Sequence, residues 1–480
     1  MGLAFIPLYI RYLGIEAYGL IGVFAILQAW LGLLDLGMRP ALAREMARFH
    51  GGAHTPQSIR ELLRSVEVVA FASAVTIALG IWAGSDWLAG DWLRAEKLPH
   101  PVVAQALWLM GVVAALGFAE NVYISSLVGL QRQVAQNVAS TAMSTARGLG
   151  AVFVLVWVAP TPKAFFLWQA AIALTSLCLS AVVVYRSLPA APRPARFSRT
   201  ALISIWRFAG GMLGITLLSI LLTQVDKLLL SRLLSLEHFG YYALAGVVTS
   251  ALFMLVGPID SAFYPRFTEL VTRKDQQGLT AAYHLGAQLV TVLMGSAAAV
   301  LIVFGERILR LWTGDAQLAG RVAPLVTVLA LGTFFNGLMH MPYQLQLAHG
   351  WTSLTIKINV VAVAILVPAI FLVVPHHGAL GAAWIWVTLN AGYLVFGIYF
   401  MHRQLLPAEK WRWYAHDVGI PLGAAAIAAG LCRLGMPGLS GRLGEAIVLF
   451  GSSVLVLSAG ALAAQRVRER MTRLVAAAAR

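Results

Sequence analysis

The stretch LYIRYLGIEAYGLIGVFAILQAWLGLLDLGMRPALAREMAR, residues 8–48, decides the fold. It joins the end of one helix, a polar corner, a complete apolar helix at about Leu20–Met38 and a basic segment that runs to Arg48. A transmembrane helix needs about 20 mostly apolar residues, so Leu20–Met38 is long enough to cross a bilayer. Asp35 is the acid within this helix.

The composition extends this interpretation to the whole chain. Hydrophobic residues make up 59% of the 480 residues and charged residues only 11%, whereas a soluble domain carries about 25% charged residues. We therefore predict an all-α integral membrane protein. Fourteen apolar segments are expected, the first of them incomplete: Met1–Ile10, Leu20–Met38, Val66–Leu88, Val102–Val128, Asn137–Val158, Ala164–Leu188, Leu202–Leu222, Gly240–Ile259, Ala282–Phe304, Val322–Leu347, Ile358–Val374, Ala379–Met401, Val418–Leu434 and Ala446–Ala463.

The basic residues predict the orientation of these segments. The chain has 35 Lys and Arg against 20 Asp and Glu, a formal net charge of +15. If the loop after Met38 is cytoplasmic and the sides alternate, the cytoplasmic loops hold about twice as many basic residues as the opposite loops, in agreement with the positive-inside rule. Both termini are then cytoplasmic, and the positive charge reflects topology and not nucleic-acid binding.

A repeat and a linker predict the domain organisation. LYIRYLGIEAYG at Leu8–Gly19 is similar to LLSRLLSLEHFG at Leu229–Gly240, and both contain the polar corner Arg-x₄-Glu-x₂-Gly. Repeats with an even number of helices have the same orientation, so we expect two pseudo-symmetric six-helix lobes around a central cavity. The predicted parts are an N-lobe at 1–187, a Pro/Arg-rich linker at 188–200, a C-lobe at 201–403, and two helices with a basic tail at 404–480.

The repeat also bears on the first helix. The seventh segment starts near Leu202, so its counterpart is expected to start about 20 residues before Met1. A natural start upstream of Met1 is one interpretation, and a short first helix is the other.

No enzyme motif is present in the sequence. A Walker-type GxxxxGK[ST], HExxH, GxSxG and CxxC are all missing, and the two cysteines, Cys178 and Cys432, form no disulfide framework. We therefore expect no enzymatic activity, no cofactor and no metal.

Ionisable residues within apolar helices are the candidate functional residues, because they are costly there and usually face a protein interior or water. Arg147 lies near the middle of its helix, and it is interpreted either as an anchor for a substrate phosphate or as a structural ion pair with an acid such as Glu120. Arg207 could reach the cavity or the membrane interface. Substrate binding in the cavity is predicted for Arg147, Arg207, Lys227, Asn336 and His340.

A second group could couple transport to an ion. Carboxylates within helices can bind Na⁺ or exchange protons, and the predicted coupling residues are Asp35, Glu120 and Asp226. The alternative for Asp35 is neutralisation of Arg39, four residues on. For the helical stripe that contains Asn336 and His340, the alternative is contact between helices.

Residues 7–48, PLYIRYLGIEAYGLIGVFAILQAWLGLLDLGMRPALAREMAR, resemble the first two helices of bacterial polysaccharide flippases. These are lipid-linked oligosaccharide translocases, for O-antigen or exopolysaccharide, of the multidrug/oligosaccharidyl-lipid/polysaccharide exporter superfamily. The similarity is strongest over Met1–Arg48, and the plan of two six-helix lobes plus two helices agrees over the rest. The family has no strict residue signature, but Arg147 and Arg207 suit its basic cavity by position and type.

The resemblance implies a flippase of the bacterial inner membrane. It would translocate an undecaprenyl-pyrophosphate-linked oligosaccharide by alternating access, with membrane lipids, a polysaccharide polymerase and glycosyltransferases as expected partners. Two alternatives stay open: a cation-coupled multidrug exporter of the same superfamily, and a non-transporting membrane component of polysaccharide assembly.

Overall fold

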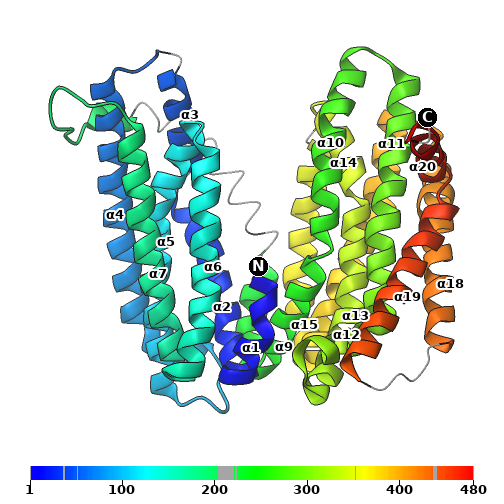
Figure 1. The fold of residues 1–480 in the computed structure, drawn as a ribbon, viewed down its shortest axis with the longest axis horizontal. Helices are drawn as coiled ribbons and strands as arrows, with labels where there is room; N and C mark the ends of the chain where they lie inside the picture. Colours follow the sequence, from blue (N-terminus) through cyan, green and yellow to red (C-terminus); the bar gives the residue numbers. More distant parts are fainter. Residues whose placement is uncertain are drawn as a thin grey trace. The chain divides into compact units, whose positions relative to one another are not determined.

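The computed structural model describes residues 2–35, 38–50, 52–203, 221, 224–351, 353–435 and 441–478. The chain divides into two compact units, Met1–Gly240 and Tyr241–Arg480, which are described separately. The helices of the first unit are α1 Gly2–Leu13, α2 Ile15–Leu31, η1 Gly32–Asp35, α3 Met38–His50, α4 Pro56–Trp87, η2 Leu88–Trp92, α5 His100–Gly129, α6 Gln133–Trp157 and α7 Pro162–Ser187 (Figure 1).

Helix α9, Leu236–Ser250, begins in the first unit and ends in the second. The later elements are α10 Phe253–Thr272, α11 Gln276–Val290, η3 Thr291–Gly295, α12 Ser296–Thr313, α13 Ala316–Leu338, α14 His340–Ala348, α15 Ser353–Gly392, η4 Tyr393–Gly397, α16 Ile398–Leu405, α17 Lys410–Arg412, η5 Trp413–Gly419, α18 Ile420–Leu434, α19 Arg442–Ala463 and α20 Gln465–Ala478.

The all-α membrane fold is confirmed. Among the described residues, 10 helices are long and apolar enough to cross a membrane, and two shorter apolar helices match the first two predicted segments. The long helical stretch Ser353–Leu405 covers two predicted segments. The backbone breaks at Gly378, with φ 58°, and this break separates the two. The segment Leu202–Leu222 lies almost entirely outside the described residues, so the count of fourteen stays a prediction.

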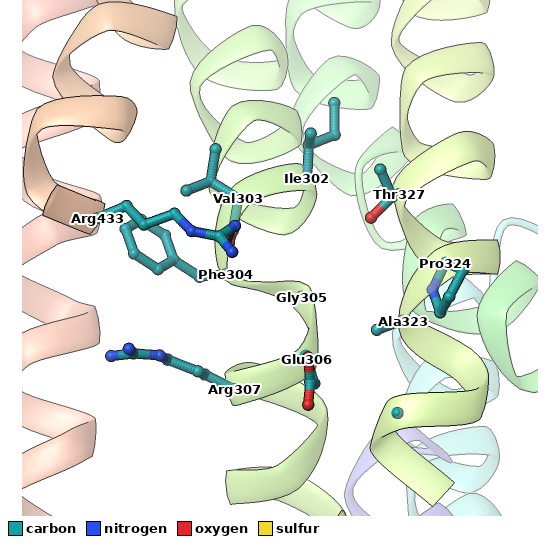
Figure 2. A pocket seen from close by; sticks show the side chains of 11 residues that line it. Ile302, Val303, Phe304, Gly305, Glu306, Arg307, Ala323, Pro324, Thr327 and Arg433 are labelled. Carbon is teal, nitrogen blue, oxygen red and sulfur yellow. Dashed lines mark hydrogen bonds between the residues drawn. The ribbon is translucent and has the colours of Figure 1, made fainter.

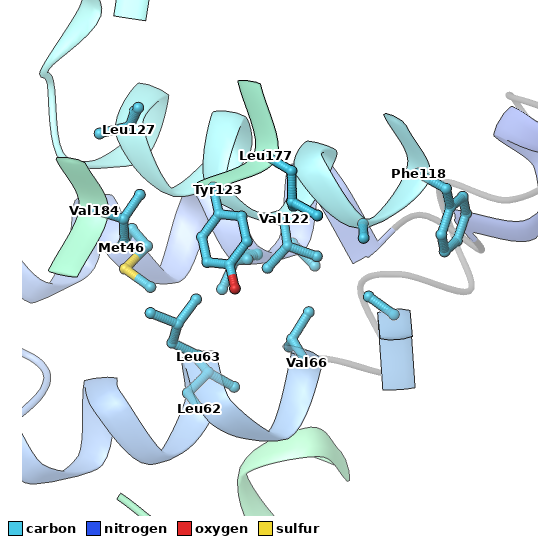
Figure 3. Close-up of a cluster of buried hydrophobic side chains, with 14 of the residues drawn as sticks. Met46, Leu62, Leu63, Val66, Phe118, Val122, Tyr123, Leu127, Leu177 and Val184 are labelled. Atoms are coloured by element: carbon cyan, nitrogen blue, oxygen red, sulfur yellow. The ribbon is translucent and has the colours of Figure 1, made fainter. Parts of the chain in front are cut away.

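The core of the first unit lies where α3, α4, α5 and α7 meet. Figure 3 shows Leu63 and Val66 of α4 facing Val122 and Tyr123 of α5. Each of these side chains is at most 7% exposed. Apolar packing between helices therefore holds α4 and α5 in a fixed position beside the polar residues described below.

The predicted linker at 188–200 contacts α4 within the first unit. The Arg60 guanidinium donates to the carbonyls of Pro189 at 2.8 Å and Leu188 at 3.1 Å. The backbone N–H of Ser198 donates to Ser65 at 2.8 Å. These bonds tie the segment to one helix of the first unit, while its role as the boundary between lobes stays a prediction.

The two copies of the repeated corner contact one another within the first unit. A Cβ added at Gly19 would lie 2.5 Å from the carbonyl oxygen of Leu236, and one added at Gly240 would lie 2.6 Å from that of Ile15. Ile15 and Leu236 occupy the same position in the two copies, as do Gly19 and Gly240. The contact is therefore reciprocal, and it requires glycine on both sides.

The corner glutamates converge on the loop before α5. The Glu16 carboxylate accepts hydrogen bonds from the backbone N–H groups of Lys97 and Leu98 at 3.0 Å, and Glu237 forms an ion pair with the Lys97 ammonium. Both carboxylates are buried. The spacing that the two copies of the repeat share thus places their two glutamates on one loop.

Replacing Gly19 or Gly240 with alanine is expected to destabilise the protein by about 1–3 kcal/mol, because a rigid backbone carbonyl occupies the position of the new methyl group. The measurement is the thermal unfolding midpoint in detergent. The control is Gly246→Ala in α9, where nothing lies within 4 Å of the added atom. Equal unfolding midpoints for Gly19→Ala and Gly246→Ala would contradict the close approach.

The stability of α3 is expected to depend on pH because of the buried carboxyl group of Glu45. Burial of Glu45 raises its pKa, but hydrogen bonds from His54 at 2.8 Å and Arg48 at 2.9 Å outweigh burial, so the pKa lies below the ordinary 4.5. A depressed folded-state pKa contributes stability above the unfolded value, and this stability is lost as the pH falls through the folded value. We expect faster amide exchange of α3 below pH 4.5, after correction for intrinsic rates, and no such change in Glu45→Gln. The variant Glu61→Gln in α4 should keep the wild-type profile.

The second unit contains a buried polar network beneath its last helices. His284 of α11 is 0% exposed, and its Nδ1 contacts Asp417 while its Nε2 lies 2.9 Å from Glu409. The Gln288 amide donates to Asp417 at 2.9 Å and its oxygen accepts from the backbone N–H of Arg466 at 2.9 Å. The network thus links α11 with η5 and with the start of α20.

Candidate functional site

A polar pocket of about 260 Å³ lies inside the first unit, among α2, η1, α3, α5, α6 and α7. We call it the basic pocket and define it by its polar residues, Gln28, Arg39, Glu120, Asn121 and Arg147. It brings together Arg147 and Glu120, which the sequence predicted as site residues in different roles. Two guanidinium groups and one carboxylate leave a net positive charge, which suits an anionic ligand.

Small residues on α6 position Arg147. A Cβ added at Gly148 would lie 2.3 Å from the Phe5 ring of α1, and one added at Gly150 would lie 2.0 Å from the Trp168 ring of α7. Glycine at these two positions therefore lets α6 pack tightly against both neighbours. This packing fixes the rotation of α6 and directs Arg147 into the basic pocket.

Arg147 has hydrogen-bonding capacity to spare. Its Nε is buried and has no hydrogen-bond partner among the described residues. A guanidinium group cannot be deprotonated in a protein, and its planar N–H fork matches the oxygens of a phosphate. An unsatisfied buried donor is costly, so a ligand that accepts from it would gain affinity.

Glu120 is held by a different helix. Its Oε1 accepts hydrogen bonds from Ser176 at 2.5 Å and Ser180 at 3.2 Å, both on α7. The part of the chain that the structure describes shows no ion pair between Glu120 and Arg147. The carboxylate is thus oriented by the two hydroxyl groups, and Arg147 remains available to a ligand.

Arg39, Gln28 and Asn121 are the polar residues of the basic pocket that the sequence did not predict, and Arg39 is the charged one. The sequence places it directly after an apolar helix, where a basic residue is an ordinary topology signal. In the structure α3 begins at Met38, and Arg39 faces the same pocket as Arg147. No spacing in the sequence could have joined residues so far apart in the chain.

In the described part of the chain, the basic pocket contains no other predicted residue of the first unit. Asp35 ends η1, and its side chain is not among those described. Lys227 Nζ lies 3.5 Å from Gln224 Oε1, and Asp226 Oδ1 is buried without a partner among the described residues. Arg207 lies outside the described residues. The roles predicted for these four residues stay predictions.

The two predicted residues of the second unit connect helices. Asn336 of α13 donates to Asn390 of α15 at 2.8 Å. His340 Nδ1 of α14 lies 2.7 Å from Asp260 of α10. Both contacts agree with the alternative interpretation of contact between helices, and substrate binding by Asn336 and His340 stays a prediction.

A second polar pocket, of about 270 Å³, lies between α12, α13 and α18 in the second unit. Figure 2 shows Arg433 reaching across to Val303, where its guanidinium donates to the carbonyl oxygen at 3.0 Å. Glu306 and Arg307 also line this pocket. It contains none of the predicted site residues. No group of three potential metal ligands occurs in the residues described.

The chain matches two known protein families. The family described as "Polysaccharide biosynthesis protein" matches residues 1–271, more than half of the sequence. The chain belongs to this family. The MatE family matches residues 212–372. The polysaccharide biosynthesis family thus accounts for the unit that contains the basic pocket.

Individual relatives agree with this family. A Shigella flexneri protein, provisionally named an O-antigen transporter, is 21% identical over 377 residues, which cover 78% of this chain and 87% of that protein. The solved structure of the lipid II flippase MurJ, in an inward closed conformation, has a TM-score of 0.71 at 10% identity and covers 96% of both chains. An inward-facing multidrug resistance MATE transporter has a TM-score of 0.68 at 14% identity, covering 84% of this chain and 93% of the other. These two structures show that this polysaccharide biosynthesis protein has the fold of a multi-pass membrane transporter.

Proposed function

We propose that this protein is a flippase that moves a lipid-linked oligosaccharide, carried on undecaprenyl pyrophosphate, from the cytoplasmic to the outer leaflet of the bacterial inner membrane. The observation that carries the proposal is the basic pocket, where the buried Nε of Arg147, within an apolar helix, has no partner among the residues that the structure describes. The family and the relative named as an O-antigen transporter support a polysaccharide substrate. The MurJ-like fold supports a flippase.

In the proposed mechanism, Arg39 and Arg147 bind the diphosphate of the substrate. Two cations next to one carboxylate favour a doubly charged anion over a neutral glycan, so the lipid-linked form is selected over free sugar. The two units alternate access to the pocket from the two sides of the membrane. Catalysis is not required, since no covalent bond changes.

An ion gradient could reset the empty carrier through Glu120. An ion at Glu120 and a diphosphate at the two arginines would occupy the same pocket, so ion and substrate binding would be linked. Asp35 and Asp226 are the other proposed coupling residues. Both termini are proposed to be cytoplasmic, and a polymerase and glycosyltransferases are the proposed partners.

Depletion of the protein tests the function directly. We expect undecaprenyl-linked oligosaccharide to accumulate on the cytoplasmic leaflet, measured by its accessibility to a lectin in inside-out vesicles, while surface polysaccharide falls. Re-expression of the wild-type chain should reverse both changes. Unchanged leaflet distribution after depletion would contradict the proposal.

A multidrug exporter is the second candidate, favoured by the MatE match to residues 212–372. Cationic drugs are expected to bind an acidic or aromatic cavity, whereas the basic pocket would repel them. Efflux of a cationic dye from loaded vesicles, driven by a Na⁺ or proton gradient, separates the two functions. Dye efflux without movement of lipid-linked sugar would favour the exporter.

A further inference from the structure

The second unit contains a long apolar groove that the proposed mechanism does not use. It lies between the two arms of the hairpin that bends at Gly378, one arm running from Ser353 and the other continuing through η4 and α16. Its volume is about 1,320 Å³. We call this hollow the hairpin groove and define it by Lys357, Ile365, Trp384, Phe396 and Arg403.

The lining of the hairpin groove is apolar and exposed. Ile365 is 60% exposed, Trp384 51% and Phe396 62%. Single exposed apolar side chains are normal on a membrane protein, but a continuous hollow of this volume calls for a ligand that fills it. These side chains are exposed on a segment long and apolar enough to cross a membrane, so a ligand would enter the groove from the hydrocarbon of the bilayer.

Two cations lie at one end of this groove. Lys357 lies near the start of the first arm and Arg403 near the end of the antiparallel second arm, so both are about 30 Å or more from the bend at Gly378 at ~1.5 Å per residue. Neither forms a hydrogen bond or ion pair within the described ranges of the chain. The predicted topology places this end at the cytoplasmic side. An apolar groove that ends in two available cations fits a lipid with an anionic head.

The length of the groove distinguishes between lipids. A phospholipid acyl chain reaches through one leaflet, about half of the ~30 Å hydrocarbon core. The lining residues extend over nearly the full length of both arms, from Trp351 to Val373 and from Gly381 to Gln404. A chain that fills the groove must therefore cross both leaflets, as an isoprenoid chain of many units can.

We propose that the hairpin groove is a loading site that binds the isoprenoid chain of a polyprenyl phosphate, with the phosphate at Lys357 and Arg403. This inference rests on the proposed function, because it assigns the groove to the lipid part of the same substrate. The basic pocket of the first unit and the hairpin groove of the second would hold that lipid in succession.

The test uses the full-length protein in phosphatidylcholine nanodiscs with undecaprenyl monophosphate that carries a photoreactive diazirine on its chain. Illumination should label peptides within residues 353–405. Gly392→Phe should reduce this labelling by at least about fivefold, because Gly392 lines the groove and nothing lies within 4 Å of an added Cβ. Gly451→Phe on α19, also with open space around the added Cβ, is the matched control and should label normally.

A second pair of variants tests the anionic head. Lys357→Gln with Arg403→Gln should weaken labelling by about tenfold, whereas Arg266→Gln with Arg273→Gln, two exposed residues of the same predicted side paired with Glu269, should not. If Gly392→Phe and the Lys357/Arg403 double variant are both labelled as strongly as the wild-type protein, the proposal is overturned. Competition by phosphatidylglycerol as strong as that by undecaprenyl phosphate would also overturn it, in favour of an ordinary phospholipid.

Failure of this inference is distinguishable from failure of the proposed function. Labelling reports binding and needs no transport, while flipping is measured by leaflet accessibility in the same variants. Normal flipping by Gly392→Phe, together with the expected loss of labelling, rejects the groove as a loading site and keeps the flippase. If the groove is labelled in a protein that moves no lipid-linked sugar, the flippase function is rejected and lipid binding in the groove is kept.

Discussion

Replacing Arg147 with alanine is expected to reduce flipping by about 10- to 100-fold, since hydrogen bonds to charged groups contribute about 1.5–3 kcal/mol. The protein should remain folded, because no hydrogen bond or ion pair to Arg147 from the described residues is lost. The measurement is leaflet accessibility of the lipid-linked oligosaccharide in vesicles with matched protein levels. Free inorganic diphosphate is expected to inhibit flipping by competing for Arg147, and this inhibition should weaken by a similar factor in Arg147→Ala.

The controls separate charge from geometry. Arg147→Lys keeps the charge but loses the planar fork, so we expect partial activity between those of alanine and wild type. Glu120→Gln should retain diphosphate inhibition but lose any response to an ion gradient. Full activity of Arg147→Ala would remove Arg147 from the substrate site and leave it a packing residue.

Replacing His284 with leucine is expected to lower the free energy of unfolding of the second unit by about 3–5 kcal/mol. The Asp417 side chain is only 2% exposed and lies against His284, so the substitution removes the imidazole partner of a buried carboxylate. The thermal unfolding midpoint in detergent should fall, and amide exchange in η5 and α20 should rise, because the network links these elements to α11.

A double variant tests the physical reason. Removing both polar side chains, with His284→Leu and Asp417→Leu, should recover much of the lost stability, because an apolar pair of similar volume replaces a buried polar pair at little cost. Arg266→Ala, which breaks an exposed ion pair with Glu269, should change stability by less than about 1 kcal/mol. If the double variant is no more stable than His284→Leu, the loss is due to packing and not to an uncompensated charge.

The sequence was a good guide to the fold because hydropathy depends on local composition. Apolar segments of helix length predicted the spans, and the short loop around Gly378 separated two of them. The Arg-x₄-Glu-x₂-Gly corner revealed the repeat. None of these predictions needed knowledge of which helices touch.

The candidate site was harder to predict because it depends on contacts between distant residues. Arg147 stood out by its depth in a helix, but Arg39 looked like a topology signal, and the serines that hold Glu120 looked like ordinary helix residues. The network of His284, Asp417 and Glu409 joins residues more than 120 positions apart. Local patterns carry no information about such pairs.

The reciprocal approach of the two repeated corners has a consequence for a chain with only one of them. Gly19 faces Leu236 and Gly240 faces Ile15, so each copy offers the other the same surface. Self-complementary surfaces of this kind are the defining property of two-fold symmetric dimers. The same backbone atoms would therefore let two half-length chains, each with a single corner, pair with one another.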